Sequence, residues 1–151
     1  MSWQRTVTGK ASAMVPMREI VGKQRPRLDA RSGRVYTPAK TRNAEQAIRE
    51  AWIAENGYRY ADFDGIVHVA VTSSRPLAKS NPRFWVGRAD TGKPDADNIL
   101  KLVLDALNGI AFKDDCQIER ASVAKLSRTA HGEQPFIHIH VIYSRETEER
   151  R

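Results

Sequence analysis

Alternating hydrophobic and polar residues predict strands at four places in the chain. The alternation is most regular in FIHIHVIY, residues 136–143, which predicts a strand at or near the centre of a sheet. Residues 65–73 also read as a strand, and residues 117–126 as a weaker one. Residues 14–22 predict a short first strand, in which Pro16 favours an edge position or a bulge.

Two other segments repeat hydrophobic residues every three or four positions, as amphipathic helices do. Residues 44–55 are the first, with Asn43 as the expected N-cap and Asn56-Gly57 as the stop. Residues 98–108 are the better one, because their apolar side chains fall within an arc of about 140° on a helical wheel. Strands and helices in this order predict an α+β fold, with both helices packed on one face of a mixed sheet.

The two ends of the chain are more polar than its middle. Residues 1–13 predict a mobile N-terminal arm and residues 145–151 a polar C-terminal tail, which leaves residues 14–144 as one small domain. No apolar run reaches the roughly 18 residues of a membrane-spanning helix, and the N-terminus lacks the pattern of a signal peptide. These features predict a cytoplasmic protein with no membrane partner.

Composition adds a strong positive charge to this picture. The chain has 25 Lys+Arg against 18 Asp+Glu, a net charge of +7, which favours a polyanionic partner such as nucleic acid. The excess lies in residues 23–43, with seven cations against one acid, and in residues 75–93, with five against one. Tyr36 lies in the first segment and Phe84-Trp85 in the second. These loops are either solvated surface or a surface that binds phosphates and stacks on bases.

Carboxylates gather just after the second basic segment. Asp95 lies at the junction between a loop and the second helix, Asp97 sits where that helix's N-cap belongs, and Lys101 follows one turn later. Acids beside a basic loop would repel the phosphates that the loop attracts. A divalent cation between them would resolve that conflict.

An acidic doublet, Asp114-Asp115, follows the second helix. If the chain returns along that helix, the doublet comes back to the Asp95 end and gathers three or four carboxylates. Such a cluster suits magnesium or manganese, which would activate water against a phosphodiester with Lys101 as an added positive group. Each residue also has a simpler explanation: Asp97 as an N-cap, Asp95 and the doublet in solvated turns, and Lys101 in a surface ion pair.

Histidine and cysteine contribute less. His138 and His140 alternate on one predicted strand, where a polar sheet face or a partner contact is favoured over metal binding. Cys116 is the only cysteine, so the chain can form no internal disulfide, and we expect a buried structural thiol.

Two motifs together resemble a known family. The run KPDADNILKLVLDALNGIAFKDDCQI resembles the core signature of the RusA family of Holliday junction resolvases, in which Asp-x-Asp-Asn opens a helix and Asp-Asp-x-Gln-Ile follows it. The upstream segment RPRLDARSGRVYTPAKT is similar to that family's N-terminal motif. The resemblance places the catalytic acids at Asp95, Asp97 and the doublet, and the catalytic lysine at Lys101. Within the doublet, Asp115 is favoured as the metal ligand and Asp114 as its neighbour.

The resemblance implies a homodimeric, magnesium-dependent endonuclease that nicks two strands of a four-way DNA junction, with manganese as a possible substitute. We expect a role in recombination, repair or the processing of phage replication intermediates, and no nucleotide cofactor, because no phosphate-cradling glycine-rich loop is present. The expected phosphate contacts are Arg25, Arg27, Lys40, Lys79 and Lys93. The alternative is a basic nucleic-acid-binding module without catalysis. Flaps and other branched DNA remain open as substrates.

Overall fold

The alternating segments form a four-stranded mixed sheet. In the computed structural model, which describes residues 2–149, its strands are β1 (Ser2–Pro16), β4 (Ile66–Ser74), β5 (Ile118–Lys125) and β6 (Phe136–Glu149). Their order is β1-β6-β4-β5, with β4 and β5 parallel and the other two pairs antiparallel. The expected mixed sheet and the inner position of β6 are confirmed.

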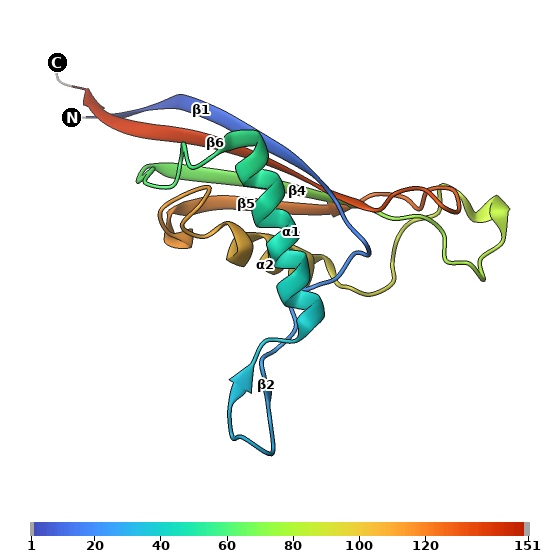
Figure 1. The fold of residues 1–151 in the computed structure, drawn as a ribbon. Helices are drawn as coiled ribbons and strands as arrows, with labels where there is room; N and C mark the ends of the chain where they lie inside the picture. Colours follow the sequence, from blue (N-terminus) through green and yellow to red (C-terminus); the bar gives the residue numbers. More distant parts are fainter. Residues whose placement is uncertain (1, 150–151) are drawn as a thin grey trace.

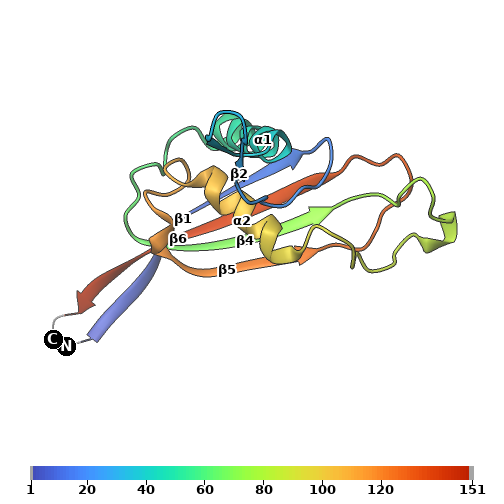
Figure 2. The same ribbon diagram turned by 90° about the horizontal axis from the view of Figure 1, so that it is seen from below.

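Two helices, α1 (Ala39–Asn56) and α2 (Ala96–Leu107), cover the same face of this sheet (Figure 2). Ile137 and Ile139 of β6 point toward the helices and are fully buried, while His138 and His140 alternate with them and are half-buried. The histidines therefore lie on the face that the helices leave uncovered, as their spacing predicts. Within residues 2–149, neither helix is long and apolar enough to cross a membrane.

The predicted mobile N-terminal arm is a strand instead, over residues 2–13. β1 pairs with β6 along almost its whole length, from Ser2 opposite Glu149 to Pro16 opposite Phe136, so residues 145–149 of the predicted tail are strand as well. This outer part of the β1–β6 ribbon is exposed on both faces, and backbone pairing rather than burial builds it. Because no side chains are buried there, this part of the sequence has no apolar alternation from which a strand could be predicted. Residues 1, 150 and 151 lie outside the described residues.

Both helices begin earlier than their apolar pattern predicts. α1 begins at Ala39, directly after Pro38, so Asn43 lies inside the helix and is not its N-cap. α2 begins at Ala96, so its N-cap is Asp95 and not Asp97. In both cases the first helical residues are mostly polar or exposed, and the hydrophobic period starts only a few residues later.

Two loops project from the body of the molecule in different directions (Figure 1). The first, which we call the hairpin arm, comprises residues 25–36 and contains the short strands β2 (Arg27–Leu28) and β3 (Val35–Tyr36). The second, which we call the aromatic arm, comprises residues 75–92 and includes a single 3-10 turn at Arg83–Trp85. The aromatic arm leads directly into the start of α2.

Candidate active site

Asp95 and Asp97, together called the acidic turn below, present two exposed carboxylates at the start of α2. Asp95 makes no capping hydrogen bond with its side chain, and within residues 2–149 neither carboxylate has a cationic partner. Lys101 is exposed on the same side of the helix as Asp97 and likewise has no acidic partner among those residues. The N-cap and ion-pair explanations of Asp97 and Lys101 are therefore not what the structure shows.

Residues 22 and 23 hold the acidic turn against the rest of the fold. The backbone N–H of Lys23 donates to the carbonyl of Asn98, at 2.9 Å. Gly22 lies so close to α2 that a β-carbon there would be 2.8 Å from the Cβ of Asn98 and 3.0 Å from that of Pro94. Only glycine fits this approach without a shift of the turn.

The side chain of Lys23 joins the two helices. Its ammonium group lies 2.6 Å from a carboxylate oxygen of Glu45 in α1 and 3.2 Å from one of Asp105 in α2. Lys23 thus serves the fold rather than the exposed basic surface. Asp105 is half-buried in this pair.

The acidic doublet, Asp114 and Asp115, is held by the side chain of Gln117. The Gln117 carbonyl accepts from the backbone N–H of Asp114 at 2.7 Å, and its amide donates to the carbonyls of Phe63 at 2.7 Å and Gly65 at 2.9 Å. The motif glutamine therefore ties the doublet to the loop before β4.

Cys116 is exposed beside the doublet, so the prediction of a buried thiol is wrong. Its thiol donates to a carboxylate oxygen of Asp114 at 3.2 Å, and this contact raises the pKa of the thiol and lowers that of Asp114. The pKa of Asp115 is raised, because its carboxyl group is hydrogen-bonded to the Asp114 carboxyl and lies close to that charge.

The doublet does not return to the acidic turn, so that expectation is wrong for a single chain. The negative charge of Asp105, in the last turns of α2, acts on Asp115, whereas the acidic turn lies at the other end of a helix about 18 Å long. The element that runs back along α2 is β5, whose last residue, Lys125, donates to the carbonyl of Gly92. Within residues 2–149 no three His, Cys, Asp or Glu side chains are grouped to hold a metal ion.

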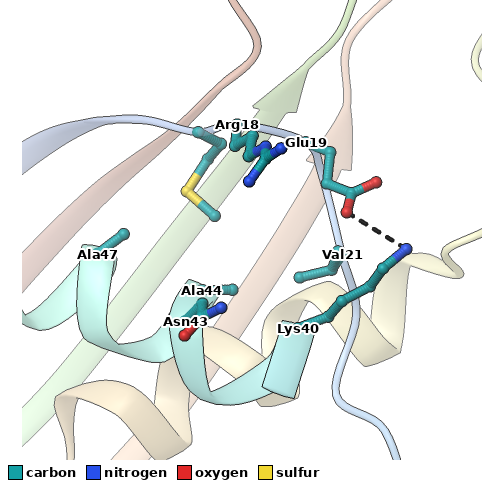
Figure 3. A pocket seen from close by; sticks show the side chains of 8 residues that line it. Arg18, Glu19, Val21, Lys40, Asn43, Ala44 and Ala47 are labelled. Atoms are coloured by element: carbon teal, nitrogen blue, oxygen red, sulfur yellow. Dashed lines mark ion pairs between the residues drawn. The ribbon is translucent and has the colours of Figure 1, made fainter. Parts of the chain in front are cut away.

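The predicted phosphate contacts are all exposed. Lys40 forms an ion pair with Glu19 at 3.4 Å, on the rim of a hollow of about 510 Å³ beside α1 (Figure 3). None of the predicted metal ligands lines this hollow. The other four predicted phosphate contacts have no acidic partner within the described residues; they are Arg25, Arg27, Lys79 and Lys93.

The acidic turn adjoins the bases of both arms, one through a contact and the other along the chain. The hairpin arm begins two residues after Lys23, which contacts Asn98 of the turn, and the aromatic arm ends three residues before Asp95. A polyanion bound by both arms would run close to the two free carboxylates, which repel it unless a cation lies between them. The sequence predicts the acids and the cations, but no local pattern reveals Gly22, Lys23 or Gln117 as the residues that position them.

Comparison with known proteins gives a family match that contains this whole site. The family described as "Endodeoxyribonuclease RusA" matches residues 18–142. The chain is also 33% identical, over 131 residues, to the uncharacterized protein YqaN of Bacillus subtilis (strain 168), and the alignment covers 80% of this chain and 88% of that protein. Both arms, the acidic turn, Lys101 and the doublet lie inside residues 18–142.

Proposed function

Because the chain belongs to the RusA family of endodeoxyribonucleases, we propose that it is a magnesium-dependent nuclease that resolves four-way DNA junctions by paired nicks. The observation that carries the proposal is the acidic turn, two exposed carboxylates that have no cationic partner within residues 2–149. The turn follows the base of the aromatic arm and lies against residues 22 and 23, just before the hairpin arm. A binding module without catalysis has no use for unpaired acids at that place, because they would weaken phosphate binding.

The donor chemistry of the turn fits magnesium. Asp95 and Asp97 offer hard carboxylate oxygens, which are the ligands that magnesium and manganese prefer. The bound ion would supply an activated water and charge stabilisation for a phosphodiester. Lys101, one turn along α2, would place a second positive charge beside the phosphate, and the cations of the arms would hold the DNA backbone.

A homodimer is the arrangement that reconciles the doublet with this site. One chain keeps the doublet and the acidic turn at opposite ends of α2, and within residues 2–149 no three potential ligands are grouped to hold a metal ion. A twofold axis that sets the two α2 helices antiparallel would put the doublet of one protomer beside the acidic turn of its partner. We propose that Asp115, with Asp114 beside it, completes the metal site of the partner subunit in this way.

The first experiment compares a labelled synthetic four-way junction with a linear duplex of matched sequence, each with and without magnesium. We expect symmetric nicks in the junction only, dependent on the metal and lost in Asp97→Asn. The matched control is Asp62→Asn, which changes an exposed acid in the loop after α1 and should nick normally. Salt-sensitive binding with no cleavage in magnesium or manganese would leave the basic binding module in its place.

The shared site is tested by mixing two inactive variants. Asp97→Asn and Asp115→Asn should each be inactive alone. In a mixed dimer, one of the two sites would combine both changes while the other would keep all its acids, so nicking of single strands should return after subunit exchange. Inactivity of the mixture, with exchange verified, would refute the shared site, and full activity of Asp115→Asn alone would remove the doublet from the metal site.

A further inference from the structure

We propose that Phe84, at the tip of the aromatic arm, stacks on a nucleobase exposed at the branch point of a DNA junction. The inference rests on the proposed function for the identity of the substrate. It adds a contact to the bases that none of the acids or phosphate-binding residues provides.

The side chain of Phe84 is exposed to solvent and is not part of the hydrophobic core. Phe84 is 83% exposed, and its ring lies in a T-shaped arrangement with that of Trp85, at a centroid distance of 6.4 Å. The neighbouring Trp85 is half-buried, with the guanidinium of Arg88 lying over its ring at 4.3 Å. Single exposed apolar residues are common on protein surfaces, so the proposal depends also on what surrounds this one.

The base of the arm is fixed by a buried ion cluster. The side chain of Asp90 is 3% exposed and accepts two hydrogen bonds of 2.7 Å from Arg75, with Arg128 at 3.4 Å from the same carboxylate. The backbone continues the attachment, because the N–H of Gly87 donates to Arg128 and the N–H of Arg128 donates to Arg88, both at 2.9 Å. The 3-10 turn that carries Phe84 is therefore held in position before any ligand binds, which lowers the entropy cost of binding.

Charge identifies the kind of partner. Beyond the buried cluster, residues 78–89 contain three cations, Lys79, Arg83 and Arg88, and no acid. An aromatic ring among cations, with no opposing carboxylate, is the composition of surfaces that follow a nucleic-acid backbone and stack on its bases. The base of the arm also runs within a few residues into the acidic turn, which connects the arm along the chain to the proposed site of cleavage.

The stacking partner follows from DNA structure. In a linear duplex both faces of each base pair are covered by its neighbours, so an aromatic ring must unstack a step before it can bind. At a branch point the stack is interrupted and the faces of the terminal bases are accessible. Phe84 would thus favour branched DNA over linear DNA with little dependence on sequence, because every base has a π-face.

The test measures dissociation constants for a four-way junction and a matched linear duplex in EDTA, where no cleavage occurs. Phe84→Ala should weaken junction binding about tenfold, the range of one lost stacking contact, and leave duplex binding nearly unchanged. Phe84→Trp should keep the preference for the junction. Tyr58→Ala, at an exposed aromatic residue beyond the C-terminal end of α1, is the matched control and should change neither constant. As a second readout, 2-aminopurine at the branch point should respond to the wild-type protein and not to Phe84→Ala.

Each result separates this inference from the proposed function. An unchanged ratio of junction to duplex affinity in Phe84→Ala, equal losses on both DNAs, or a change of oligomeric state would overturn the stacking role. If the wild-type protein and Phe84→Trp prefer the junction and Phe84→Ala does not, but no nicking occurs in magnesium or manganese, the nuclease is overturned and the stacking contact is kept. No binding to either DNA by the wild-type protein would overturn both.

Discussion

The least exposed charge in the aromatic arm is a carboxylate that does no chemistry in our proposal. Burial of Asp90 would raise its pKa, but the hydrogen bonds from Arg75 and the charges of Arg75, Lys125 and Arg128 outweigh burial and lower the pKa below its ordinary value of 3.8. The ionised form is thus the one that the folded arm stabilises. Arg75, one of the five cations of residues 75–93, is therefore neutralised inside the protein and does not add to the basic surface.

Asp90→Asn should destabilise the fold by about 3 kcal/mol at neutral pH, because it leaves buried cations without their partner. Since the folded pKa is lowered, the stabilisation is complete above about pH 4 and is lost as pH falls through the folded pKa. Urea unfolding at pH 7 and pH 3 measures both effects, and the difference between wild type and variant should shrink at the lower pH. Asp64→Asn, which breaks an exposed pair with Arg145, serves as control and should leave stability nearly unchanged.

Tyr143 gives a second prediction for a single residue. Its buried hydroxyl donates to the carbonyl of Ala111 at 2.7 Å, and burial raises the tyrosine pKa, so the donor stays protonated. Tyr143→Phe keeps the stacking on Tyr60 but leaves a buried carbonyl without a partner, which should cost about 1–2 kcal/mol of unfolding free energy. Tyr58→Phe changes an exposed hydroxyl and should cost nothing measurable. An equal urea midpoint for Tyr143→Phe and wild type would contradict this role.

At the scale of elements, the contact between Gly22 and the start of α2 decides where the acidic turn sits. Gly22→Ala would place a methyl group 2.8 Å from the Cβ of Asn98, so the turn must move. A displacement of about 1 Å in catalytic groups commonly costs up to 100-fold in rate, so nicking should fall about 10- to 100-fold. Junction affinity in EDTA should hardly change, because the arms still bind the phosphates. A fall in affinity matching the fall in rate would point instead to general loss of structure.

The elements that bury an apolar face are those that the sequence predicts well. The strands at residues 65–73 and 117–126 and the helix at residues 98–108 are found within one or two residues of their predicted bounds. The outer part of β1 was missed because its pairing with β6 buries no side chains and leaves no periodic signal. A hydrophobic pattern reports burial, whereas this ribbon is held by backbone hydrogen bonds and by exposed polar pairs such as Arg5 with Glu119 and Glu146.

For the candidate site, the sequence predicts a chemistry but not a geometry. Residue types and spacing single out Asp95, Asp97, Lys101 and the doublet as candidates but leave a simpler explanation open for each, and the family resemblance supplies their predicted roles. The distance between the acidic turn and the doublet depends on which segment runs back along α2. The parallel pairing of β5 with β4 decides this, and it joins residues some 50 positions apart. A local pattern carries no information about such a pairing.

At the scale of the whole molecule, the two arms should contribute different kinds of contact to DNA, and the difference can be measured. The hairpin arm presents Arg25 and Arg27 with no acidic partner within residues 2–149, so its contacts with DNA should be contacts with phosphates. Phosphate contacts release counterions and are the same on every sequence and shape of DNA. The aromatic arm adds the base contact that depends on shape. Removing the hairpin arm's cations should therefore change the salt dependence of DNA binding, whereas removing the aromatic arm's Phe84 should change the preference for branched DNA.

The double variant Arg25→Ala/Arg27→Ala should reduce the slope of log K against log salt concentration by about 2, because each phosphate contact contributes about one unit. The reduction should be equal for the four-way junction and the linear duplex, whereas Phe84→Ala should leave both slopes unchanged and weaken only the junction. Arg59→Ala, an exposed cation beyond the C-terminal end of α1, is the matched control. Titrations between low and moderate salt measure the slopes, and an effect of the double variant confined to the junction would show that the hairpin arm reads branching rather than charge.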